Sequence, residues 1–167
     1  MDDRSVVAWQ LGRSLRAFRR VVVRCPFGLP AVTEQEPYGP HGEPFPTTYY
    51  LTCRHLVAAM SRLEAAGGVE RWGEAVARDP ELAESLQRAT EEQRALRMEL
   101  AAGRTGNDAG ASLALGIGGA SRPERLKCLH AHAAYALARP GYLLGERILA
   151  ELDPRWPERC CSRPAEG

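Results

Sequence analysis

The sequence lacks any apolar run close to the ~20 residues that a membrane span requires. Its start, MDDRSVVAWQLGRSLRAFRR, also lacks the uninterrupted apolar segment of a secretory signal. Lysine is almost missing, because Lys127 is the only lysine among 22 Lys and Arg residues. The net charge of +1 gives no basic excess that a nucleic-acid partner would require. We therefore expect a cytoplasmic protein with no membrane association and no nucleic-acid partner.

Cysteine pairing is also restricted. The chain has five cysteines, and an odd number excludes a fully paired disulfide framework within one chain. In a reducing compartment these cysteines are thiols or metal ligands. No local Cys-x-x-Cys knuckle, the usual signature of a structural zinc site, is present.

The apolar patterning predicts a mixed α+β chain. β-branched and aromatic runs at 20–25, 31–37 and 47–52 predict strands, and Pro/Gly-rich segments separate them. Helical periodicity is expected near residues 7–18, from about 54 to the Gly67-Gly68 pair, over 79–102, over 121–139 and over 142–152. We predict one domain over residues 1–152, with a small antiparallel sheet of about three strands covered by four to five helices. Residues 153–167 are expected to form an irregular tail.

Three cysteines fall at the predicted edges of elements. Cys25 and Cys53 end strands, and Cys128 lies in the first turns of the expected 121–139 helix, where His132 is four residues further on and shares its face. Thiolates with one imidazole suit an iron–sulfur cluster or zinc. We therefore predict a metal centre of Cys25, Cys53, Cys128 and His132. The alternative is that the three cysteines are unrelated core residues, because cysteine is often buried as a small hydrophobe.

The segment GIGGASRPERLK predicts an anion site. It matches neither the Walker pattern nor a full G-x-G-x-x-G, but a glycine-rich loop before a helix start can bind an anion. The candidate anion-binding residues are Gly118, Gly119, Arg122 and Lys127. His130, rotated away from the expected ligand face, is the candidate acid/base, with Lys127 beside it. The alternatives are an ordinary flexible loop and a Lys127 side chain that only extends into water.

Several of these motifs together resemble a known family. The segments CPFGLPAV, PFPTTYYLTC, SRLEAAG, GIGG and LKCLHAHAAYALA are similar, in this order, to the bacterial, mainly actinobacterial, domain-of-unknown-function family numbered 501. The resemblance covers roughly residues 20–152 and implies no activity. Genes of this family tend to lie near those for enolase, a septum-formation initiator and an exopolyphosphatase. The motif positions that it carries over are Cys25, Cys53, Lys127, Cys128, His130 and His132. Relatives often have proline where this chain has Arg54, which leaves the turn after Cys53 open.

Two function classes follow from these residues. The first is an enzyme with the metal centre, acting on an anionic or nucleotide-like small molecule. The second is a non-catalytic interaction module, zinc-stabilised or metal-free, linked to cell division or envelope metabolism. An RNA-binding role has less support, because the arginines are scattered and matched by acids.

Overall fold

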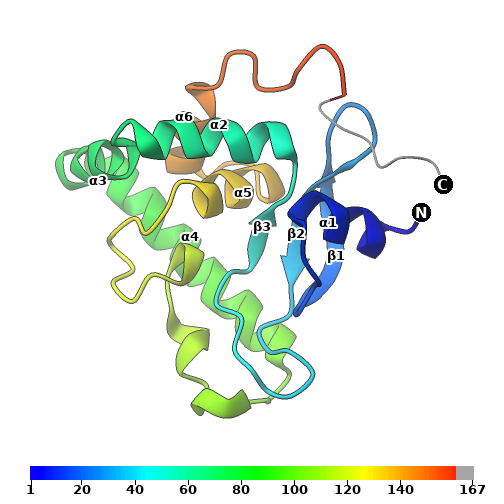
Figure 1. Cartoon of the computed structure of the whole chain (residues 1–167). Coiled ribbons are helices and arrows are strands. Elements are labelled where there is room, and N and C mark those ends of the chain that lie inside the picture. Colours follow the sequence, from blue (N-terminus) through cyan, green and yellow to red (C-terminus); the bar gives the residue numbers. More distant parts are fainter. Residues whose placement is uncertain (161–167) are drawn as a thin grey trace.

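Three strands form one antiparallel sheet in the order β1-β2-β3. They are β1 (Phe18–Arg24), β2 (Pro30–Gln35) and β3 (Tyr49–Leu51). The structure is a computed structural model that describes residues 1–160 (Figure 1). The turn between β1 and β2 closes with Cys25 N donating to Leu29 O at 2.8 Å and Gly28 N donating to Cys25 O at 2.9 Å. Gly28 has a φ of 82°, which glycine adopts without strain. The turn predicted at CPFG is therefore present.

Six α-helices surround this sheet within residues 1–160 (Figure 1). They are α1 (Asp3–Leu11), α2 (Arg54–Ala65), α3 (Gly68–Arg78), α4 (Pro80–Ala101), α5 (His130–Ala138) and α6 (Leu143–Ala150). Three short 3₁₀ turns, η1 (Gly106–Asp108), η2 (Ala111–Ala114) and η3 (Ile117–Gly119), lie in the long connection from α4 to α5. In the described part of the chain, no helix is long and apolar enough to cross a membrane.

Helix α5 lies next to β3, whereas α1 packs against β1 and β2 (Figure 1). Helix α5 contacts all three strands, α2 and α6. Its sequence, HAHAAYALA, is rich in alanine, and small side chains allow close approach on every side. Gly145 of α6 shows how close this packing is, because a Cβ there would lie 2.5 Å from His132 O. The helix that carries the KCLHAH motif is thus a core element.

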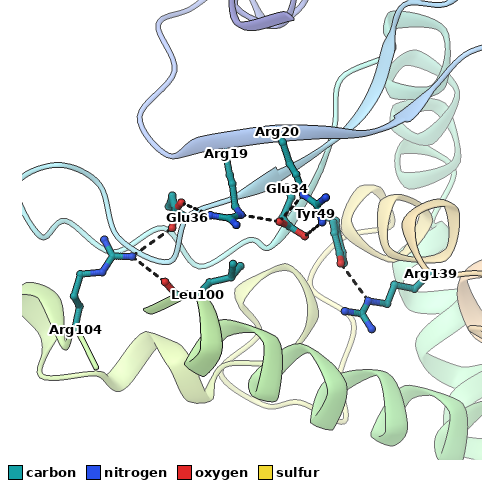
Figure 2. Close-up of polar contacts among 8 residues, drawn as sticks. All are labelled: Arg19, Arg20, Glu34, Glu36, Tyr49, Leu100, Arg104 and Arg139. Atoms are coloured by element: carbon teal, nitrogen blue, oxygen red, sulfur yellow. Dashed lines mark hydrogen bonds and ion pairs between the residues drawn. The ribbon is translucent and has the colours of Figure 1, made fainter. Parts of the chain in front are cut away.

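A layer of charged side chains lies beside the sheet (Figure 2). Glu34 of β2 is 2% exposed, and its carboxylate accepts from Arg19 Nε at 3.1 Å and Arg20 Nε at 3.0 Å. Arg139, just after α5, donates to the hydroxyl of Tyr49 on β3 at 3.2 Å. These bonds satisfy a buried carboxylate and join the edge strand β1 to β2.

The predicted class, α+β with a three-stranded antiparallel sheet, is confirmed, with one helix more than expected. The extra helix is α3, which the Gly67-Gly68 pair concealed. Gly67, with a φ of 83°, lets the chain turn, and a Cβ on Gly68 would lie 2.5 Å from Leu63 O. The two glycines therefore form a tight corner between two helices rather than the entrance to a loop.

The first predicted helix was too long. Periodicity placed a helix near residues 7–18, whereas α1 ends at Leu11 and Gly12 takes the left-handed conformation with a φ of 66°. The start of α4 was predicted correctly, because Asp79 accepts from Glu81 N at 2.9 Å and Pro80 occupies the first turn. Of the tail expected at 153–167, residues 153–160 contain no helix or strand and 161–167 lie outside the described residues.

Candidate functional site

The N-terminus of α5 is fixed by a side chain from another helix. Glu64 of α2 accepts a hydrogen bond from Leu129 N, with Oε1 2.7 Å away. This carboxylate satisfies an amide that has no partner within the helix, and its charge suits the positive end of the helix dipole. The sequence predicted a helix over 121–139. The helix begins only at His130, so its start was predicted nine residues too early.

Cys128 therefore precedes the helix and lies at its amide-rich end. Burial raises the pKa of the Cys128 thiol, and the Glu64 charge raises it further. The backbone amides of Ala131 and His130 and the charge of Lys127 lower this pKa without reversing the effect of burial. Cys128 is consequently a protonated thiol at neutral pH, next to amides that would stabilise negative charge.

His130 and Glu64 form a hydrogen-bonded pair. Nδ1 of His130 lies 2.8 Å from Glu64 Oε1, and the two side chains are 28% and 26% exposed. Nε2 lies 3.3 Å from both Ser61 Oγ and Val57 O on α2. A carboxylate on one ring nitrogen fixes the orientation of the imidazole. This arrangement suits a group that accepts and returns a proton.

A cavity of about 310 Å³ opens beside these groups. We call it the β3–α5 cavity. Its lining residues are Leu11, Thr47, Tyr49, Tyr50, Leu51, Val57, Cys128, His130 and Ala131. Most of this wall is apolar, and a thiol, an imidazole and a few hydroxyl groups interrupt it. Apolar walls with a few polar groups are typical of small-molecule sites.

The glycine loop adjoins the same place. Gly118 and Gly119 have φ values of 69° and 80°, and a Cβ on Gly118 would lie 3.5 Å from Cys128 Sγ. A Cβ on Gly119 would lie 3.9 Å from Lys127 Nζ. The structure therefore gathers Gly118, Gly119, Lys127 and Cys128. Arg122 is exposed and its side chain makes no hydrogen bond or ion pair within residues 1–160, so it is not joined to this group.

The predicted metal ligands are not gathered. Among residues 1–160, no group of three or more His, Cys, Asp or Glu side chains could hold a metal ion. Cys25 and Cys53 are buried and belong to the hydrophobic core. The predicted shared helical face of Cys128 and His132 is wrong, because only His132 lies on the helix. The metal centre, whether zinc or iron–sulfur, thus has no support from the fold.

His132 belongs to the core instead. Its side chain is fully buried, and Nδ1 forms a 2.7 Å hydrogen bond with the hydroxyl of Tyr142. Burial lowers the pKa of His132 to about 4, so the imidazole is neutral at physiological pH. Its Nε2 is buried without a partner in the described structure. The residue therefore packs α5 against the start of α6.

Sequence reasoning missed the partners of His130. Glu64 and Ser61 lie on α2, more than sixty positions earlier in the chain. The motif SRLEAAG contains both residues, but periodicity places them only on an amphipathic helix. Only the packing of α2 against α5 reveals their role.

Comparison with known proteins gives one match. A family profile described as "Protein of unknown function (DUF501)" matches residues 21–150. No curated protein and no solved structure is significantly similar to the chain. The profile match covers most of the chain, including β2, β3, the second half of β1 and the KCLHAH segment.

Proposed function

We propose that this chain, which belongs to the DUF501 family, binds a small organic anion in the β3–α5 cavity and acts on it by proton transfer. The observation that carries the proposal is the His130–Glu64 pair, because His130 lines the cavity together with Cys128. Lys127 Nζ lies near Gly119 of the adjoining glycine loop. His130 is the acid/base, and Glu64 orients it. Lys127 holds the anionic group.

The cavity itself indicates the class of ligand. Its 310 Å³ lies at the lower end of the range for small-molecule sites, which favours a small anion over a full nucleotide. Leu11, Leu51 and Val57 would contact an apolar part of the ligand. The anionic group would face Lys127 and the N-terminal amides of α5, where the helix dipole favours negative charge. Cys128 also lines the cavity.

The two earlier alternatives have less support. A zinc or iron–sulfur centre does not enter the proposal, because its expected ligands are not gathered in the described structure. An interaction module would be favoured by an exposed apolar surface. The only large hydrophobic side chains that are well exposed in the described part of the chain are Met1, at the N-terminus, and Met98, on α4.

Protection of Cys128 from alkylation tests the binding. Small aliphatic carboxylates and phosphate monoesters should slow the reaction of Cys128 with iodoacetamide, measured on its peptide by mass spectrometry. Lys127→Ala should weaken this protection about two- to fivefold, since Lys127 is exposed and an exposed charge contact contributes about 1 kcal/mol or less. His130→Gln should leave protection nearly intact, because His130 acts on the ligand rather than anchoring it.

Arg125→Ala is the matched control. Arg125 is an exposed basic residue two positions before Lys127, and its loss changes the net charge equally. If protection weakens equally in Lys127→Ala and Arg125→Ala, the effect comes from the net charge of the protein and not from a contact between Lys127 and the anion. Protection by none of the anions would refute the proposed function.

A further inference from the structure

Arg97 of α4 is the least satisfied charged group in the described structure. The residue is 0% exposed, and its one hydrogen bond is a long contact of 3.4 Å from Nη1 to Thr48 Oγ1. Nε and Nη2 are buried and have no partner among residues 1–160. An unpaired buried charge destabilises a fold by several kcal/mol, so such groups normally have a counter-charge or a ligand.

The two unpartnered nitrogens lie on one edge of the guanidinium. Nε–H and Nη2–H point in nearly parallel directions and form the fork that binds two oxygens of a carboxylate or phosphate. Arg20 uses this same edge in the same protein, with Nε at 3.0 Å and Nη2 at 3.4 Å from the two oxygens of Glu34 (Figure 2). In Arg97 the corresponding edge faces no acceptor.

Asp108 is the carboxylate whose charge acts on Arg97, yet its oxygens form no ion pair with Arg97 within 4.0 Å among residues 1–160. It already accepts from Tyr38 Oη at 2.8 Å, Gly110 N at 3.0 Å and Ser112 N at 2.9 Å. These three donors hold its charge in place, and the Arg97 fork stays unused.

We propose that the Arg97 fork is a binding site for one small inorganic oxyanion, of the size of phosphate, sulfate or bicarbonate. The anion would accept two hydrogen bonds from Arg97, beside the hydroxyl group of Thr48. Complete enclosure of the arginine excludes a larger organic ligand. This site is separate from the β3–α5 cavity, and it does not depend on the function proposed there.

The anion has a structural consequence. Arg97 belongs to α4 and Thr48 lies just before β3. One anion would therefore link these two segments around a buried charge. Binding to the folded state alone would raise stability with the logarithm of the anion concentration.

Thermal unfolding with inorganic phosphate tests this site. At constant ionic strength, the Tm of the wild-type protein should rise by about 5 °C or more once phosphate exceeds its Kd about a hundredfold. Arg97→Met keeps the length of the side chain but removes the fork, and its Tm should not respond to phosphate. Arg88→Met is the matched control, since it removes an exposed arginine of the same helix and should respond as the wild type does.

If the Arg97→Met variant fails to fold, a second measurement on the wild-type protein still tests the proposal. Wild-type protein is desalted, denatured and assayed for released phosphate and sulfate, with one anion per chain expected. The titration is repeated with sulfate and bicarbonate to identify the preferred anion. The proposal fails if no anion raises the Tm and none is released, because waters would then satisfy Arg97. It also fails if Arg97→Met and the wild type respond equally.

Discussion

At the scale of single residues, His132 makes stability depend on pH. The pKa of His132 is lowered by burial from 6.5 to about 4, so the unfolded chain binds a proton at a higher pH than the folded protein does. Stability contributed by the neutral imidazole is therefore complete above about pH 6.5 and is lost as the pH falls to about 4. We expect a loss of about 3 kcal/mol over this window in denaturant titrations.

His132→Gln should flatten this pH dependence, because glutamine does not titrate. An NMR titration of the His132 ring in the wild-type protein provides a check that needs no variant. A ring that titrates near 6.5, or a variant with the same pH slope as the wild type, would contradict the prediction.

Cys128 should respond in opposite directions to its two charged neighbours. The Glu64 carboxylate raises the pKa of the Cys128 thiol, and the Lys127 amine lowers it. Glu64→Gln keeps an acceptor for Leu129 N but removes the charge, so it should speed alkylation of Cys128 at pH 8 by about two- to fivefold. Lys127→Ala should slow the reaction by a similar factor.

Rates measured from pH 7 to 10 separate the thiol pKa from access to the sulfur. Both variants must keep the wild-type Tm for the comparison to hold. A common direction of change in the two variants would show that access, rather than charge, controls the reaction.

At the scale of elements, Arg19 and Arg20 hold the edge strand β1 through one carboxylate. Each arginine forms an ion pair with the buried Glu34, so either one can compensate for the loss of the other. We expect Arg19→Ala and Arg20→Ala to cost about 1 kcal/mol or less each. The double variant should cost about 3 kcal/mol or more, because Glu34 is then left buried without a counter-charge.

A double-mutant cycle by chemical denaturation measures this coupling. Arg24→Ala on the same strand is the control, since Arg24 pairs with Asp3 at a half-exposed position. It should combine additively with Arg19→Ala. An additive Arg19/Arg20 pair would mean that water reaches Glu34 when both arginines are absent.

The elements also show how far sequence patterns reach. β-branched runs and Pro/Gly punctuation predicted all three strands, because these signals are local. The start of α5 was predicted too early, because its N-terminus is fixed by Glu64, which lies 65 positions before Leu129. The local sequence pattern that predicted a helix from residue 121 is overridden here by tertiary packing.

The candidate site was predictable only in part. Gly118, Gly119, Lys127, Cys128 and His130 lie close together along the chain, so sequence spacing alone suggested a common site. Sequence spacing cannot predict contacts between segments that are far apart in the chain. The predicted metal centre depended on such contacts, and its four residues divide between the hydrophobic core, the cavity and the α5–α6 packing.

At the scale of the whole molecule, the last described segment closes the core. Trp156 is partly buried and packs against the main hydrophobic cluster, although it lies beyond the last helix. Trp156→Ala should lower the free energy of unfolding by about 2 kcal/mol, because it removes a large apolar contact. Arg155→Ala, an exposed neighbour, should change it by less than about 0.5 kcal/mol. Denaturant unfolding of the two variants and the wild type measures these free energies. Equal stabilities would mean that the segment containing Trp156 does not stabilise the fold.

The walls of the β3–α5 cavity come from segments far apart in the sequence, since Leu11 and Cys128 both line it. Contacts of such long sequence separation form late in folding, after the loops between them have closed. No fragment of the chain can therefore build the cavity by itself. A bound ligand would slow hydrogen exchange of the α5 amides that open only by global unfolding, and would leave exchange at fraying helix ends unchanged. Occupancy of the cavity is thus coupled to the cooperative unfolding of the entire domain.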